Sequence, residues 1–186
     1  MNELLEKLTG GDLRSDGRGD EVADEVIRNP LLLDKLVEGL SESDDVIRAR
    51  TVHALERISR TKPELLQGLT SRFIELADTD TVPMVKWHLA MIFGNMTFSE
   101  KETDTVVSAL FRLLKEDSVF VKSWAIVSLT IIGRKNMKKK GEISSRIKTF
   151  QNDKSIAIRT KVAKALRILE NENEQIPPNW IKGDFK

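Results

Sequence analysis

One twelve-residue pattern occurs four times in this chain, and the repetition restricts the folds that are open to it. Its copies begin at Ile47, Val85, Val121 and Ile158, so successive starts lie 38, 36 and 37 residues apart. In each copy, positions 1, 5, 6, 8, 9 and 12 are apolar or small, apart from the hydroxyl-bearing Thr51 and Ser128. This spacing places the apolar side chains on one stripe of an α-helix and differs from the two-residue alternation of a strand.

A second helix is expected before each copy, over residues 30–40, 63–77, 102–115 and 142–150. Short acidic turns such as Asp78-Thr79-Asp80 follow these helices. Their Asp and Ser side chains can accept hydrogen bonds from the free N–H groups that begin the next helix. Because no single helix pair can bury its apolar stripe, the pairs are predicted to stack into a solenoid with one continuous core.

The form Asp-x-x-x-Val-Arg-x-x-Ala-x-x-Ala-Leu in the second helix, at this period, resembles the HEAT repeat over about residues 30–170. The resemblance implies an all-α fold, a right-handed α-α superhelix of the HEAT/ARM type with about four helix pairs. Two elements, Asp16-Gly17-Arg18 and Trp87-His88-Leu89-Ala90, are also similar to a recurrent group of short prokaryotic HEAT proteins. That similarity implies a fold and no particular activity.

Before the repeats, the chain departs from the pattern. A short helix near residues 2–8, a loop and a helix over residues 20–28 are expected there, because Gly17 and Gly19 disfavour a longer helix. Such an atypical pair suits the capping end of a solenoid. We therefore predict one solenoid domain over residues 1–170.

The C-terminal tail, residues 171–186, leaves the pattern again. Pro177-Pro178 excludes a helix there. The tail nevertheless carries four apolar side chains, Ile176, Trp180, Ile181 and Phe185. Three states stay open: a frayed end, a segment folded back over the last helix pair, or a segment docked on another molecule.

Composition excludes several classes of function. The chain has no cysteine, which rules out disulfides, cysteine zinc sites and a thiol nucleophile. Gly10-Gly11 is followed by Asp12-Leu13 and not by the Gly-Lys-Ser/Thr of a phosphate loop. No secretory signal is visible at the N-terminus, and the longest uncharged stretch, residues 123–133, is shorter than the ~20 residues of a membrane helix. We expect a soluble cytoplasmic protein that is not an enzyme and needs no cofactor.

The predicted working face lies on the second helices, which line the concave wall in the architecture that the HEAT resemblance implies. Positions 3, 4, 7 and 11 of each copy fall outside the apolar stripe, and two of the three tryptophans occupy such positions. Partly exposed indole is enriched at binding hot spots, so we predict that a partner protein or peptide binds there. The predicted contacts are Arg50, His53, Trp87, His88, Met91, Trp124 and Val127. The alternative is that both tryptophans pack between repeats.

The two histidines, His53 and His88, are predicted on adjacent second helices, one turn out of register. A metal site needs a third ligand, and no carboxylate is aligned with them, so no metal is predicted. We expect them at a surface or an interface.

The net charge is only +1, but the charged residues are distributed unevenly along the chain. Residues 1–60 carry 9 basic and 14 acidic side chains, whereas residues 134–170 carry 12 basic and 3 acidic ones. Residues 134–140 are expected to form a loop that enters the last helix pair. Candidate contacts to phosphate or to an acidic partner are Arg134, Lys135, Lys138, Lys139, Lys140, Lys161 and Lys164.

This basic end supports an alternative function, a nucleic-acid-binding helical-repeat protein. A solvated loop is the plainer explanation, and weak head-to-tail self-association of an otherwise monomeric protein is a further one. Position 2 of each copy is also basic, at Arg48, Lys86, Lys122 and Arg159. The HEAT resemblance implies that this column forms a structural ladder with acidic residues of adjacent repeats.

Overall fold

The computed structural model describes residues 1–181, and every regular element in that part of the chain is helical. The elements are α1 (Glu3–Glu6), α2 (Gly19–Arg28), η1 (Pro30–Leu32), α3 (Leu33–Glu38), η2 (Gly39–Ser41), α4 (Asp45–Thr61), η3 (Pro63–Leu69), α5 (Thr70–Thr79), α6 (Pro83–Asn95), α7 (Glu100–Leu113), α8 (Val119–Lys135), α9 (Met137–Lys148) and α10 (Ile156–Glu170). None of these helices combines the length and the apolar character needed to cross a bilayer.

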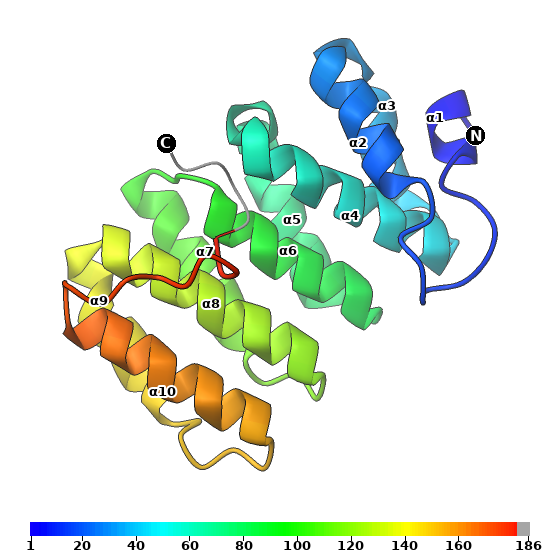
Figure 1. Ribbon diagram of the computed structural model, residues 1–186. Helices are drawn as coiled ribbons and strands as arrows, with labels where there is room; N and C mark the ends of the chain where they lie inside the picture. Colours follow the sequence, from blue (N-terminus) through cyan, green and yellow to red (C-terminus); the bar gives the residue numbers. More distant parts are fainter. Residues whose placement is uncertain (182–186) are drawn as a thin grey trace.

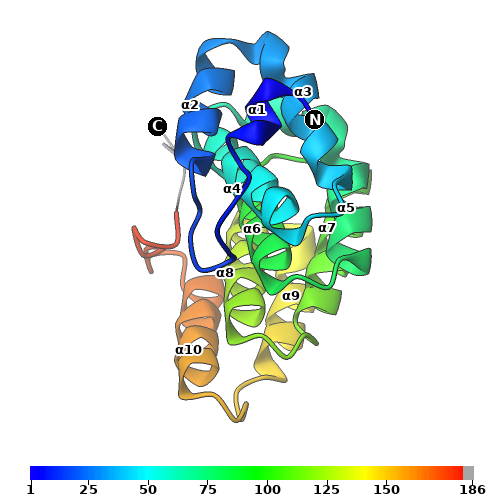
Figure 2. The same ribbon diagram turned by 90° about the vertical axis from the view of Figure 1, so that its right-hand side faces the viewer.

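The helices form two layers (Figures 1 and 2). Helices α2, α4, α6, α8 and α10 lie side by side in chain order and are called the even layer below. Helices α3, α5, α7 and α9 form the odd layer behind it. Buried side chains such as Leu55, Phe73, Phe93 and Leu110 belong to one continuous core. The prediction of an all-α solenoid of stacked helix pairs is confirmed.

Side-chain caps begin three helices of the even layer, α4, α8 and α10, as the acidic turns predict. Asp44, Ser118 and Ser155 each accept hydrogen bonds from backbone N–H groups in the first turns of α4, α8 and α10. Helix α6 starts differently, with Pro83 in its first turn, where no N–H donor is needed. The local sequence therefore sets where these helices start.

The basic column pairs with the next repeat. Arg48 Nε lies 2.6 Å from Asp80, Lys86 Nζ lies 2.7 Å from Glu116, and Lys122 Nζ lies 3.3 Å from Asp153. Arg159, the member of the column in the fourth copy, donates instead to the carbonyl oxygens of Asp153 and Lys154. The predicted ladder is thus confirmed for the first three members of the column.

Three expected elements differ from the structure. The range 30–40 is divided among η1, α3 and η2, and the range 63–77 starts with the 3-10 helix η3 before α5. Residues 134–140 are not a loop: Arg134 and Lys135 end α8, and α9 begins at Met137. Asn136 explains this early start, because its side chain accepts from the backbone N–H of Lys139.

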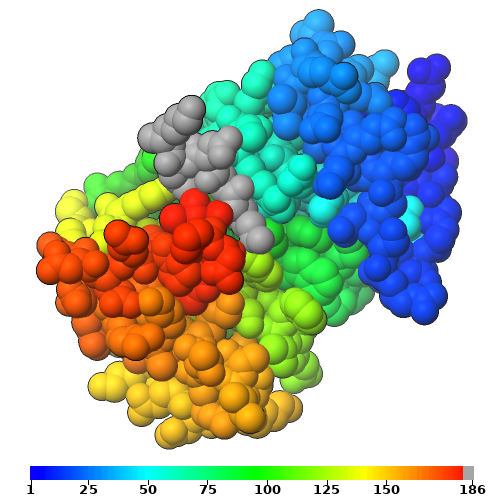
Figure 3. All heavy atoms as spheres, in the orientation of Figure 1, coloured from blue at the N-terminus to red at the C-terminus, as the bar shows by residue number. Residues whose placement is uncertain are grey.

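The ends of the chain lie against the even layer. Residues 9–18 form a loop between α1 and α2 that passes along α4 (Figure 2). The tail over residues 171–181 crosses the even layer at α8 and α10 (Figures 1 and 3). Phe185 lies outside the described residues.

Candidate functional site

The structure buries most of the predicted partner contacts. Arg50, His53, His88, Met91 and Val127 are almost inaccessible. Trp87 and Trp124 are half-buried against the core and keep an accessible face. The reason is that each inner helix of the even layer is covered by a neighbour on either side, which hides positions that a lone helix pair would expose.

Arg50 holds the N-terminal loop. Its side chain is 4% exposed, and its guanidinium donates to five backbone carbonyl oxygens at 2.6–3.3 Å. These oxygens belong to Leu8, Thr9, Gly10, Asp12 and Ser15. Gly17 packs on the same group with φ of +55°, and a Cβ there would lie 2.7 Å from Arg50 Cζ. The guanidinium therefore has a structural role, because its N–H groups bind the N-terminal loop and not a partner.

An aromatic ridge runs over the even layer, made of Trp87, Phe120 and Trp124. The rings of Trp87 and Phe120 are 5.2 Å apart, and Phe120 is 64% exposed. Trp124 lies one turn beyond Phe120 on the same face of α8. Lys161 of α10 lies 5.9 Å from the Trp124 ring and 5.2 Å from the ring of Trp180 in the tail. The ridge thus leads from α6 to the tail.

The tail packs on α8 and α10 as an irregular segment with two turns, one closed by the Glu174 N–H to the Asn171 carbonyl oxygen and one by the Trp180 N–H to the Pro177 carbonyl oxygen. Arg134 donates to the carbonyl oxygens of Asn171, Glu172 and Glu174 at 2.8–3.3 Å. Lys164 pairs with the Glu174 carboxylate, and Trp180 is only 5% exposed. Three of the predicted basic contacts, Arg134, Lys161 and Lys164, are therefore used by the chain's own C-terminal segment.

The other predicted basic residues lie around the start of α9. Lys138 pairs with Glu100, and Lys139 pairs with Asp104 and Glu142. Lys135 is exposed, and Lys140 is half-buried. Salt bridges to α7 and within α9 thus neutralise part of the positive charge that the sequence concentrates here.

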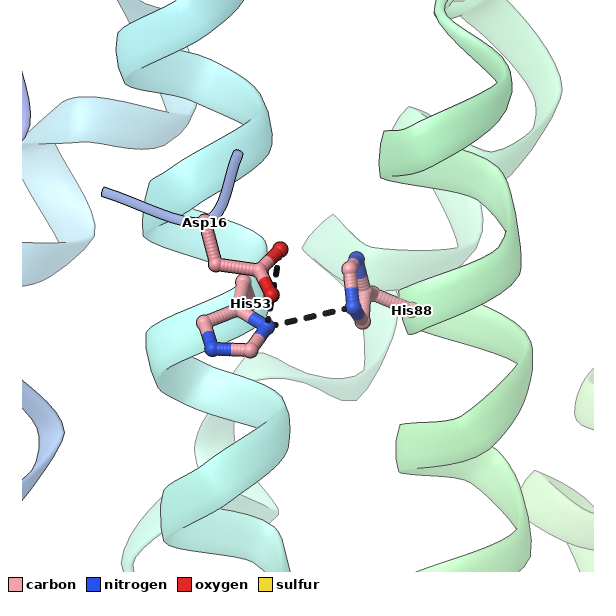
Figure 4. A group of neighbouring side chains, drawn as sticks. All are labelled: Asp16, His53 and His88. Atoms are coloured by element: carbon pink, nitrogen blue, oxygen red, sulfur yellow. Dashed lines mark hydrogen bonds and ion pairs between the residues drawn. The ribbon is translucent and has the colours of Figure 1, made fainter. Parts of the chain in front are cut away.

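The two histidines meet in the even layer, beside the carboxylate of Asp16 (Figure 4). His53 Nδ1 lies 3.2 Å from His88 Nε2 and 3.6 Å from the carboxylate of Asp16, which comes from the N-terminal loop. The ligand atoms of Asp16, His53 and His88 all lie within 4.8 Å of one another. The expectation that no carboxylate accompanies the histidines is wrong.

The outer nitrogens of both rings are also engaged. His53 Nε2 lies 2.8 Å from Asp20, and His88 Nδ1 lies 2.9 Å from the Met84 carbonyl oxygen. Burial, together with the neighbouring His53, lowers the pKa of His88 from 6.5 to about 3. Partial burial of Asp20 acts to raise its pKa, but the hydrogen bond from His53 and the charge of Arg57 lower it on balance.

Sequence reasoning missed three members of these sites. Asp16 and Asp20 belong to the atypical N-terminal segment, whose position over α4 no repeat register predicts. Phe120 directly precedes the third copy of the pattern, so it lies outside the twelve positions of the repeat. Its spacing of four residues from Trp124 was the available signal, because side chains four apart share a helix face.

No protein-family model and no curated protein match this chain. Solved structures of designed proteins are similar to it. An engineered protein from a structural-genomics consortium matches with a TM-score of 0.64 and 21% identity, over 90% of this chain and 79% of its own. A designed armadillo repeat protein in complex with peptide (KR)4 matches with a TM-score of 0.65 and 17% identity, over 90% and 80%. These similarities show that the chain has the fold of a helical-repeat solenoid.

Proposed function

We propose that this protein is a non-enzymatic scaffold whose even layer binds a non-helical peptide segment of a partner protein. One observation carries the proposal: the chain's own tail, an irregular segment with two turns, is held on α8 and α10, in part through its backbone carbonyl oxygens. Recognition through the main chain is independent of sequence, so a surface of this kind can accept segments other than the tail.

The side chains around the tail define the chemistry of the partner segment. Lys164 binds a carboxylate, and Lys161 lies over the Trp180 ring, a favourable cation–π arrangement. Beyond the tail, the ridge offers Trp124 and the exposed Phe120. The partner segment is therefore a peptide with an acidic residue followed by aromatic or large apolar residues. The armadillo neighbour that binds a peptide supports this use of the architecture.

Nucleic acid is the less favoured partner. Three basic candidates hold the tail, and Lys138 and Lys139 pair with carboxylates of α7 and α9. Phosphate binding would have to break several of these pairs. Single-strand binding favours aromatic side chains on which bases can stack, and none alternates with the basic residues of the α8–α9 junction.

A synthetic peptide with the sequence of residues 171–181, labelled with fluorescein, tests the proposal. It is titrated against the full chain carrying Glu174→Ala and Trp180→Ala, substitutions that loosen the resident tail. We expect saturable binding by fluorescence anisotropy. Adding Trp87→Ala and Trp124→Ala should cost about 2–4 kcal/mol of affinity, because buried aromatic anchors dominate peptide binding.

The matched control is Leu31→Ala, which removes an exposed apolar side chain from η1, away from the tail. The proposal fails if the peptide does not bind, or if the tryptophan variant binds it as well as the control does. Binding of duplex or single-stranded DNA instead, with affinity falling steeply as salt rises, would establish the alternative function.

Two finer assignments belong to the same proposal. The repeats are of the HEAT type, an assignment supported by two main helices per repeat and by the ladder that begins with Arg48 and Asp80. Residues 1–170 form a single domain, supported by the one core that runs through its helices.

A further inference from the structure

The His53–His88 contact leaves two nitrogen lone pairs facing each other. His53 Nε2 faces the Asp20 carboxylate and His88 Nδ1 faces the Met84 carbonyl oxygen, and because both partners accept, each of these outer ring nitrogens carries a hydrogen. The remaining nitrogens, His53 Nδ1 and His88 Nε2, are 3.2 Å apart. Facing lone pairs repel unless a proton or a cation lies between them.

The spacing of the three inner atoms fits a metal ion. Around a tetrahedral Zn²⁺ with bonds of about 2.0–2.1 Å, neighbouring ligand atoms are about 3.3 Å apart. His53 Nδ1 lies 3.2 Å from His88 Nε2 and 3.6 Å from Asp16 Oδ1. A proton shared by the two nitrogens would also relieve this repulsion, but the Asp16 carboxylate beside them completes a set of three possible ligand atoms.

The groups behind the ligands hold them in place. Asp20 and the Met84 carbonyl oxygen accept from the outer ring nitrogens, which is the arrangement that orients histidines bound to metals. Arg57 Nε in turn lies 3.0 Å from Asp20. Gly19 permits this approach, since a Cβ there would lie 2.7 Å from His53 Cδ2. Arg50 fixes the loop at Ser15, directly before Asp16.

We propose that Asp16, His53 and His88 form a binding site for one divalent transition-metal ion of the Zn²⁺ type. Two imidazoles among three ligands favour such an ion over Mg²⁺ or Ca²⁺, which prefer oxygen. The Asp16 side chain is 57% exposed, so the fourth position faces solvent and takes water. The ion links the N-terminal loop to α4 and α6, whereas the tail lies on α8 and α10.

Binding of the ion requires the hydrogen bond between Trp87 and His88 to break. Trp87 Nε1–H donates to His88 Nε2 at 3.3 Å, so it occupies the lone pair that the metal needs. Metal binding breaks this long bond and changes the environment of the Trp87 indole. Trp87 therefore reports on the site.

Calorimetric titration of tag-free, chelator-treated full-length protein with ZnCl₂ tests the site. We expect one ion per chain, and a loss of affinity of about tenfold or more in Asp16→Asn. Asp20→Asn, which keeps all three ligands, should lower affinity about 10- to 100-fold. The matched control is Asp12→Asn, in the same exposed loop, which should bind as the unaltered chain does. All three positions are exposed, so folding of the variants, checked by circular dichroism, is not at risk.

Ring ¹⁵N chemical shifts identify the ligand atoms directly, because the chain has only two histidines. Zn²⁺ should shift Nδ1 of His53 and Nε2 of His88, and should change tryptophan fluorescence in the unaltered chain but not in Trp87→Phe. The proposal is overturned if no ion binds. It is equally overturned if Zn²⁺ binds without moving either ring nitrogen, or if Asp16→Asn binds as tightly as Asp12→Asn.

Discussion

At the scale of the residue, Arg50 shows how a surface-type side chain becomes structural. Its guanidinium presents several N–H donors in a fixed plane, and the N-terminal loop supplies backbone carbonyl oxygens around it. Main-chain oxygens buried without a donor are costly, so this one side chain satisfies a loop that has no regular structure of its own. The same contacts set the position of Asp16.

Truncation of this side chain tests that role. We expect Arg50→Ala to lower the free energy of unfolding by about 3 kcal/mol, because bonds to a charged donor are among the stronger ones. Hydrogen exchange of the amides in residues 9–18 should also become faster. Arg14→Ala, which removes an exposed pair with Asp12 in the same loop, should leave the stability almost unchanged, because solvent screens such a pair. Equal stability of the two variants would contradict the assignment.

At the scale of the element, local capping explains where helices begin. Helix α7 starts with a capping box, in which the Ser99 hydroxyl accepts from the Glu102 N–H and the Glu102 carboxylate accepts from the Ser99 N–H. Hydrogen bonds with Ser99 lower the pKa of the Glu102 carboxyl. The helix therefore begins at Glu100, two residues before the expected start, for reasons contained in four residues.

Ser99→Ala removes one half of the box. Thermal or denaturant unfolding should show a loss of about 1 kcal/mol, the usual effect of an N-cap serine. Ser108→Ala is the control, because Ser108 lies on the exposed side of the same helix and donates only to the Asp104 carbonyl oxygen. Alanine there should be neutral or slightly stabilising, since it has the higher helix propensity. A larger loss at Ser108 than at Ser99 would refute the capping argument.

At the scale of the whole molecule, stability is distributed along the stack. Leu55 of α4 and Leu129 of α8 occupy the same position of the repeat and are fully buried, whereas the equivalent Leu166 of α10 is half-buried. The difference follows from the architecture, because in the described part of the chain α10 packs against one even-layer helix, α8, whereas α4 and α8 each lie between two.

Alanine at these three positions measures the distribution. Guanidinium unfolding should give losses of about 2–5 kcal/mol for Leu55→Ala and Leu129→Ala, and a smaller loss for Leu166→Ala. The first two should add within about 0.5 kcal/mol in the double variant, because α6 separates their helices. Losses below about 1 kcal/mol at both buried positions would contradict the repeat register.

Features that depend on neighbours a few residues away could be predicted from the sequence. The spacing of apolar residues placed the four even-layer helices after α2, and Asp or Ser before most of them marked their starts. These features follow from helix geometry and local hydrogen bonding, which are the same wherever the segment lies. The pairing of Arg48, Lys86 and Lys122 with the next repeat was implied by the HEAT resemblance.

Which side chains come into contact depends on how distant segments of the chain pack, and this is visible only in the folded structure. His53 and His88 are 35 residues apart, and Asp16 joins them from a loop that follows no repeat. Burial of Met91 and Val127, and occupation of Arg134 by the tail, also depend on segments that pack from elsewhere in the chain. A period within a helix identifies its inward stripe, but the surfaces that neighbouring helices and the two chain ends cover are fixed only when the stack has formed.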